Sequence, residues 1–230
     1  MKWDDLLPQW PLFIEQAAVI LERPLFQTEI DRYQQFFSSL LQWNQIHNLI
    51  GPAAERELLI RHGLDSLSFY PYLVSGRPMA DLGSGAGFPG LILGMIEQPA
   101  FQIDLLERIG KKRDFLAYQI DQLQLTARLR SLAAGDSQEG YAVVCSRAVG
   151  DLAHVARQAW PLLQPGGVYL ALKGARHQQE LQQWQRLKQI RDRFEAPQPL
   201  AGVGESIVIR LRRRTPHPPA PSPTGGEGEA

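Results

Sequence analysis

A glycine-rich segment in the middle of the chain constrains its fold more than any other feature. It reads Asp81-Leu82-Gly83-Ser84-Gly85-Ala86-Gly87-Phe88-Pro89-Gly90. The apolar run before it predicts a β-strand at residues 79–82, and residues 91–96 after it predict a helix. The glycines at 83, 85 and 87 let a ligand approach the backbone where a Cβ would collide. The order strand, glycine turn, helix indicates a ligand-binding turn at the edge of an α/β sheet, with backbone N–H groups facing the ligand.

Segments that alternate between β-like and helical patterns continue downstream of this turn. The pattern predicts helices at residues 111–125 and 152–163 and strands at residues 101–107, 129–133, 141–145, 168–172 and 206–211. Strands that alternate with helices are typical of a mostly parallel sheet covered on both faces. The predicted fold class is therefore α/β.

The first 74 residues predict a helical extension. Apolar and aromatic side chains recur every three or four positions over residues 28–49, with Thr28 as the expected N-cap residue. A second helix is predicted over residues 53–73. The predicted domains are therefore the extension at 1–74, the α/β domain at 75–214, and a disordered tail rich in proline and glycine at 215–230.

The residues around the glycine turn distinguish between two classes of ligand. The spacing Gly85-x-Gly87-x-x-Gly90 satisfies the dinucleotide-binding pattern. Asp81, however, would repel a pyrophosphate and suits a cation such as S-adenosyl-L-methionine, a sulfonium with an α-amino group. Glu107 ends the next strand, where a carboxylate accepts hydrogen bonds from ribose hydroxyls. The pattern favours a Rossmann-like class I methyltransferase that uses S-adenosyl-L-methionine; a dinucleotide site and a turn without a ligand remain alternatives.

Composition excludes several other protein classes. One cysteine excludes an intramolecular disulfide framework and a cysteine-built zinc site, and we expect no metal. No apolar run approaches the ~18 residues of a membrane span, and Asp4 and Asp5 stand where a signal peptide would be basic. We therefore expect a cytoplasmic protein that binds no membrane.

The charge of the chain is uneven. Residues 1–70 carry 5 Lys/Arg against 9 Asp/Glu, a balance of −4, and the remaining 19 against 15 give +4. This asymmetry permits a locally basic face of the kind an RNA partner requires.

An ordered set of short motifs resembles one known family. The motifs are Trp43-Asn44-x-x-x-Asn48-Leu49, Arg61-His62-x-x-Asp65-Ser66, Phe88-Pro89-Gly90, Gly110-Lys111-Lys112, Ser146-Arg147-Ala148 and Ala171-Leu172-Lys173-Gly174. In this order, over about residues 30 to 210, they resemble the bacterial small-subunit ribosomal RNA guanine-N7 methyltransferases, first named glucose-inhibited division protein B. The resemblance implies methyl transfer from S-adenosyl-L-methionine to N7 of a guanine in the 530 loop of 16S rRNA, within the small subunit or an assembly intermediate. We expect a monomer.

The resemblance and the glycine-turn pattern together nominate the site residues. The expected cofactor-binding residues are Asp81, Gly83, Gly85, Gly87, Phe88, Glu107, Gly135, Asp136 and Arg147. The residues expected to position the acceptor guanine for catalysis are Arg147, His62 and Asn48, and the expected RNA-binding residues are Arg61, Lys111, Lys112 and Lys173. Cations at the start of a helix, as at Lys111 and Lys112, are unfavourable unless an anion binds there.

Several residues have alternative interpretations. Arg147 could form a structural ion pair with Asp81 or Glu107, and Asp65 could orient the His62 ring from one helical turn away. Ala134 stands where the family usually carries an arginine, which leaves open a non-catalytic RNA-binding protein of the same fold. A methyltransferase of another substrate is the remaining alternative.

Overall fold

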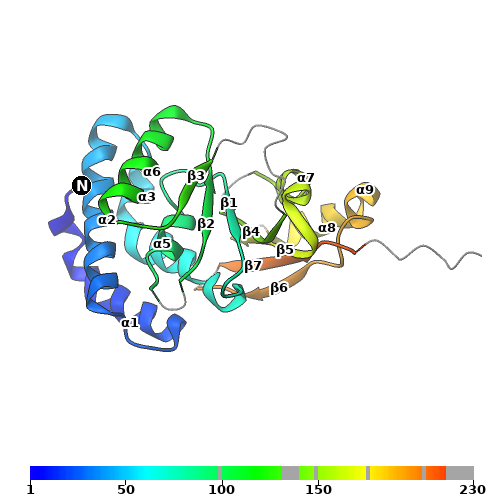
Figure 1. Cartoon of the computed structure of the whole chain (residues 1–230), viewed down its shortest axis with the longest axis horizontal. Coiled ribbons are helices and arrows are strands. Elements are labelled where there is room, and N and C mark those ends of the chain that lie inside the picture. The colour runs from blue at the N-terminus through cyan, green and yellow to red at the C-terminus, as the bar shows by residue number, and fades with distance from the viewer. Residues whose placement is uncertain (98–99, 131–139, 148–149, 175–176, 204–205, 216–230) are drawn as a thin grey trace, which may run out of the picture.

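A seven-stranded β-sheet forms the centre of the chain (Figure 1). The computed structural model describes residues 1–97, 100–130, 140–147, 150–174, 177–203 and 206–215. The strands are β1 (Met79–Leu82), β2 (Ile103–Leu106), β3 (Arg128–Arg130), β4 (Tyr141–Arg147), β5 (Leu163–Lys173), β6 (Gln198–Ala201) and β7 (Ile207–Arg212). Their order is β3-β2-β1-β4-β5-β7-β6. The neighbours from β3 to β5 pair in parallel, whereas β7 runs antiparallel to both β5 and β6.

Helices cover both faces of this sheet. They are α1 (Trp10–Leu21), α2 (Gln27–His47), α3 (Pro52–Arg56), α4 (Asp65–Leu67), α5 (Gly90–Gly94), α6 (Gly110–Gln122), α7 (Leu152–Leu162), α8 (His177–Gln185) and α9 (Lys188–Arg191). A π-helical segment at Leu58–Leu64 leads into α4. None of the helices in the described ranges is both long and apolar enough to cross a membrane.

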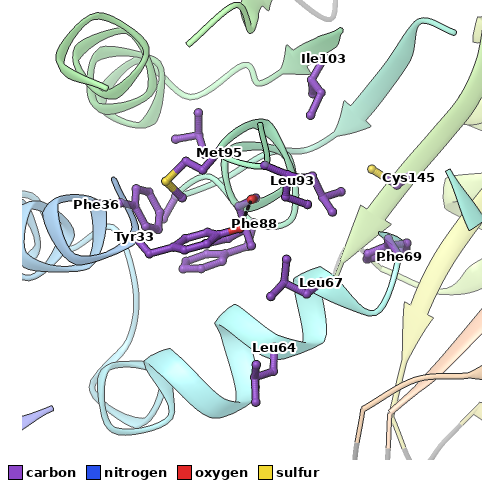
Figure 2. Close-up of a cluster of buried hydrophobic side chains, with 14 of the residues drawn as sticks. Tyr33, Phe36, Leu64, Leu67, Phe69, Phe88, Leu93, Met95, Ile103 and Cys145 are labelled. Atoms are coloured by element: carbon purple, nitrogen blue, oxygen red, sulfur yellow. Dashed lines mark hydrogen bonds between the residues drawn. The ribbon is translucent and has the colours of Figure 1, made fainter. Parts of the chain in front are cut away.

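The alternation of side chains along the strands produces two hydrophobic clusters. One cluster joins the N-terminal helices, α5 and α6 to one face of the sheet, and it contains Phe36, Phe115 and Cys145. Figure 2 shows Tyr33 and Phe36 of α2 beside Phe88. The other cluster packs α7, α8 and α9 against the opposite face, through residues such as Val155 and Trp184. The helical extension and the sheet therefore share one core.

Glu29 anchors the start of α2 to the sheet domain. Its buried carboxylate accepts hydrogen bonds from Arg23, from the Phe26 N–H at 2.9 Å and from the Glu97 N–H at 2.8 Å. Burial acts to raise the pKa of Glu29, but these hydrogen bonds outweigh burial and hold the pKa below its ordinary value. Ionised Glu29 therefore stabilises the fold.

Replacing Glu29 by Gln is expected to lower the free energy of unfolding by about 2–3 kcal/mol at pH 7. Because the folded-state pKa is depressed, this contribution is present above the ordinary pKa near 4.5 and is lost as the pH falls through the folded-state value. Urea unfolding at several pH values should therefore show the difference shrinking below pH ~4.5. The exposed Glu15→Gln on α1 is the control, and a difference that persists unchanged to low pH would contradict this account.

Most predicted elements occur close to their predicted positions. The strand at residues 79–82 is confirmed at both ends, and β2, β4, β5, β7, α6 and α7 agree within a few residues. Thr28 as N-cap residue is wrong, because α2 begins at Gln27 after Phe26 and Glu29 satisfies the Phe26 N–H. The helix predicted over residues 53–73 is broken into α3, the π-helical segment, α4 and a 3₁₀ turn at Tyr70–Tyr72. The predicted tail lies outside the described residues, apart from Thr215.

Candidate cofactor and guanine site

The candidate site lies at the carboxyl edge of the parallel strands. The strand order turns from β2-β1 to β1-β4, so the crevice beyond β1 and β4 is the topological switch point where such sheets bind ligands. The glycine turn follows β1, Glu107 follows β2 directly, and Arg147 is the last residue of β4. The sheet therefore brings three of the predicted site segments to one edge.

The glycine turn has a backbone that only glycine adopts easily. Gly83, Gly85 and Gly87 have φ values of +78°, +58° and +97°. The space beside Gly85 is open, because a Cβ there would have only Gly83 O at 3.8 Å and Lys112 Nζ at 3.9 Å as neighbours. At Gly90 a Cβ would collide with the Leu105 side chain and lie 2.6 Å from Asp81 Oδ2. Gly85 therefore leaves room for a ligand, whereas Gly90 is required by packing.

The N–H groups of this turn bond within the protein. Gly83 and Ser84 donate to Leu106 O at 2.8 and 3.2 Å, and Gly87 and Phe88 donate to Ser84 O at 2.8 and 3.1 Å. The Gly85 N–H also donates within the protein, to Glu107 Oε2. The expectation that these N–H groups face a ligand is thus wrong for this conformation. A pyrophosphate needs free N–H donors, so the turn is poorly suited to a dinucleotide.

Asp81 lies buried beneath the turn. Its Oδ2 accepts a hydrogen bond from the Gly90 N–H at 2.9 Å, and its Oδ1 has no hydrogen-bond partner among the described residues. Burial raises the pKa of Asp81 to about 7, against the hydrogen bonds from Gly90 and Ser84. A buried carboxylate with an unsatisfied oxygen suits a nearby cation and opposes a phosphate.

Glu107 closes the turn from the side of β2. Its Oε2 accepts from the Gly85 N–H at 2.8 Å, and its Oε1 accepts from the Arg108 and Ile109 N–H groups at 2.8 and 2.9 Å. These three donors orient the carboxylate, and each oxygen retains a second lone pair for a hydroxyl donor. The open glycine, the buried Asp81 and the oriented Glu107 fit S-adenosyl-L-methionine.

Phe88 connects the turn to the helical extension and to β4. Its ring centroid lies 5.6 Å from that of Phe36 on α2 and 5.7 Å from that of His62. The Arg147 guanidinium lies over the same ring, with Cζ 5.4 Å from the centroid. Arg147 Nη2 also contacts His62 Nδ1. The structure thus brings Phe88, His62 and Arg147 together, although they lie far apart in the sequence.

Arg147 has no carboxylate partner among the described residues. The alternative ion pair with Asp81 or Glu107 does not form, because Arg147 points to His62 and Phe88 instead. Burial, with a smaller effect of the Arg61 charge, lowers the pKa of Arg147 to about 10, so the side chain is still charged at pH 7. Since Arg147 is a donor at every physiological pH, His62 Nδ1 must accept, and the His62 Nε2 is buried without a partner.

Asp65 does not orient the His62 ring. Its carboxylate accepts a hydrogen bond from the Ser206 side chain, and burial raises its pKa to about 6. Arg147 takes the orienting role from β4. The predicted i, i+3 pair fails because the π-helical segment changes the residues that share a face over Leu58–Leu64.

The lysines at the start of α6 have different surroundings. Lys111 Nζ donates to the carbonyls of His47 at 2.7 Å and Asn48 at 3.2 Å, and so caps the end of α2. Asn48 is exposed and ends α2 in the left-handed conformation. Lys112 lies near Gly85 and forms no ion pair among the described residues. Lys112 is therefore the lysine of this pair that remains available to an anion.

The other expected RNA contacts are paired within the protein. Arg61 is exposed on the π-helical segment and pairs with Glu57 at 3.0 Å. Lys173 is largely buried, pairs with Glu180 at 2.8 Å and donates to Gly150 O at 2.9 Å. Glu180 was not predicted as a partner, because no local spacing relates it to Lys173. Gly135 and Asp136, with the neighbouring Ala134, lie outside the described residues.

Comparisons with known proteins agree with this geometry. The family profile described as GidB, rRNA small subunit methyltransferase G, matches residues 29–201. Ribosomal RNA small subunit methyltransferase G of Halorhodospira halophila is 38% identical over 207 residues, 87% of this chain and 96% of that protein. The protein of the same name from Xanthomonas campestris pv. campestris strain B100 is 38% identical over 150 residues, 64% of this chain and 70% of that one.

A solved structure supports the fold independently. A Methanococcus maripaludis protein, classed with the S-adenosyl-L-methionine-dependent methyltransferases, superposes with a TM-score of 0.52 at 13% identity, covering 80% of this chain and 95% of that one. At this identity the likeness concerns the fold alone, which is the Rossmann-like class I methyltransferase fold. With the family profile and the relatives above, this chain belongs to the rRNA small subunit methyltransferase G family.

Proposed function

We propose that this protein transfers the methyl group of S-adenosyl-L-methionine to N7 of a guanine in the 530 loop of 16S rRNA. The observation that carries the reaction class is a glycine turn without free N–H donors over the buried, unsatisfied carboxylate of Asp81. That arrangement suits a cationic cofactor and opposes a pyrophosphate. The family supplies the substrate.

The chemistry makes limited demands on the protein. When bound, S-adenosyl-L-methionine supplies an electrophilic methyl group on its sulfonium sulfur. Guanine N7 has a free lone pair and no proton to lose, so no general base is needed. The side chains must align the nucleophile with the methyl group and exclude water. Phe88, His62 and Arg147, packed together beside the turn, supply a rigid wall for that purpose.

Within this proposal the site residues have distinct roles. Glu107 and the glycines 83, 85 and 87 hold the cofactor, Asp81 provides its counter-charge, and Gly135 and Asp136 complete the cofactor site as their family positions imply. Arg147 and His62 position the guanine, and Asn48 lies at the adjoining end of α2. Arg61 and Lys112 contact RNA phosphates. Lys111 and Lys173 act through the carbonyls and the carboxylate that they hold.

The proposal extends to the setting of the reaction. The acceptor is 16S rRNA within the small ribosomal subunit or an assembly intermediate, and the enzyme acts as a cytoplasmic monomer. Among the described residues no group of three or more His, Cys, Asp or Glu side chains could hold a metal ion. The reaction as proposed uses none.

The decisive experiment is methyl transfer from labelled S-adenosyl-L-methionine to small subunits from cells that lack this gene. Mass mapping should find the label on a single guanine of the 530 loop, as N7-methylguanine. Label on another nucleotide would retain the reaction class and overturn the substrate. Intact cofactor binding without transfer to the subunit or to free 16S rRNA would overturn the enzymatic proposal.

A further inference from the structure

The cations without protein partners lie on the opposite face from the helical extension. On the side predicted to meet RNA, Arg61, Lys111 and Lys173 are held by protein acceptors. On the α7–α9 face, Arg157 and Arg186 are exposed and make no ion pair or hydrogen bond with the described residues. The free positive charge therefore lies away from the predicted RNA contacts.

These two arginines line a surface pocket between α7 and α8. The pocket has a volume of about 340 Å³ and is lined by Asp151, Ala153, Arg157, Gln183, Arg186 and Leu187. Asp151 is its one acidic residue, and its carboxylate already accepts the His154 N–H at 2.8 Å as the cap of α7. Two guanidinium groups against one engaged carboxylate make this pocket receptive to an anion.

A second group of arginines continues the positive charge along α7. Arg193 and Arg213 lie over the Trp160 ring, with Cζ 4.6 and 4.4 Å from its centroid. Arg213 donates to backbone carbonyls, and Arg214 donates to Phe194 O at 2.9 Å. Carbonyl acceptors fix these side chains without neutralising them. Residues 186–214 carry 8 Lys/Arg against 3 Asp/Glu, so the local charge is strongly positive.

The position of α7 links both groups to the active edge. Arg157 and Trp160 are three residues apart on α7 and so lie on one side of the helix. α7 begins shortly after β4 ends at Arg147, and it contacts α8 and α9 on that side of the sheet (Figure 1). A chain of phosphates that leaves the site near Arg147 can thus follow α7. We call Arg157, Arg186, Arg193, Arg213 and Arg214 the arginine strip.

We propose that the arginine strip binds the sugar–phosphate backbone of the rRNA, with one phosphate in the pocket between Arg157 and Arg186. The identity of the RNA rests on the proposed function. Guanidinium groups bind phosphate oxygens through paired N–H donors, and the regular spacing of phosphates matches a row of cations better than an isolated acidic side chain does. The strip adds affinity for the RNA outside the reacting guanine.

The test compares the double variant Arg157→Gln/Arg186→Gln with the intact protein. We expect the KM for small subunits lacking the methyl group to rise at least tenfold, while kcat and the affinity for S-adenosyl-L-methionine stay unchanged. The salt dependence of binding to protein-free 16S rRNA should weaken, its logarithmic slope falling by about 1.4 for two lost phosphate contacts. Arg157→Lys/Arg186→Lys should restore most of that slope.

A matched control removes two exposed charges elsewhere, at Lys2 and Arg77. Lys2→Gln/Arg77→Gln should retain the KM and the slope of the intact protein. Equal behaviour of the two double variants would overturn the strip. Weaker binding to the assembled subunit alone, with unchanged binding to protein-free rRNA, would also overturn it and identify an acidic protein partner. If the intact protein transfers no methyl group but only the strip variant loses salt-dependent RNA binding, the strip stands and the proposed function fails.

Discussion

Replacing Asp81 by Asn is expected to stabilise the cofactor-free protein above pH 7 and to weaken its affinity for S-adenosyl-L-methionine at least tenfold. The Asp81 carboxylate is fully buried, and one of its oxygens has no partner among the described residues. Asn can still accept the Gly90 N–H, because it retains a carbonyl oxygen. The substitution therefore removes a buried charge while keeping the hydrogen bond that orders the turn.

The pH dependence gives this prediction its sign. The pKa of Asp81 rises from 3.8 to about 7 on folding, so the folded state holds the proton more tightly than the unfolded state. Stability attributable to Asp81 is full below pH ~4, falls as the pH rises toward 7 and is then constant. The gain from Asp81→Asn should accordingly be near zero at pH 4 and about 2–4 kcal/mol at pH 8. Urea unfolding across this range measures it.

Cofactor affinity provides the second readout. A cationic ligand near Asp81 favours the ionised carboxylate, so Asp81 is expected to release its proton as the cofactor binds at pH 7. Titration calorimetry in two buffers of different ionisation enthalpy detects that proton in the intact protein and its absence in Asp81→Asn. The exposed Asp121→Asn serves as the control. Unchanged cofactor affinity in Asp81→Asn would remove Asp81 from the site.

The sequence predicted best those features that depend on local pattern. The strand Met79–Leu82 and the turn after it follow from a short apolar run and a glycine spacing, and both depend on neighbouring residues alone. α8, α9 and β6 were not predicted, because they are short and largely polar, so hydrophobic periodicity is weak there. The elements of the site were therefore predicted more completely than those of the C-terminal region.

Contacts between distant segments could not be predicted in the same way. Lys173 was expected to face RNA, but Glu180 pairs with it and also accepts the Leu152 N–H that begins α7. Lys111 was expected to bind phosphate, but it lies where it satisfies carbonyls at the end of α2. A charged residue in a motif indicates that charge is needed. Which partner receives it depends on three-dimensional packing.

Arg147→Ala is expected to lower kcat/KM for methyl transfer by about 100- to 1000-fold. The guanidinium packs on Phe88 and contacts His62 at the end of β4, where the acceptor must be aligned with the cofactor. Its charge is partly buried without a carboxylate partner among the described residues, and burial lowers its pKa to about 10. Removing such a charge should leave thermal stability unchanged or slightly raised. An arginine with a purely structural role would show the opposite, with lost stability and retained activity.

A double-mutant cycle with His62→Ala tests whether the two side chains act as one unit. Because Arg147 Nη2 contacts His62 Nδ1, each single substitution removes the same interaction, and the double variant should be little worse than Arg147→Ala alone. Steady-state kinetics with small subunits measure the cycle, and Arg108→Ala, outside this contact, is the control. Additive losses would mean that His62 and Arg147 contribute separately. In that case Arg147 would position the guanine on its own, through Phe88, and the contact with His62 would serve only to attach the helical extension to β4.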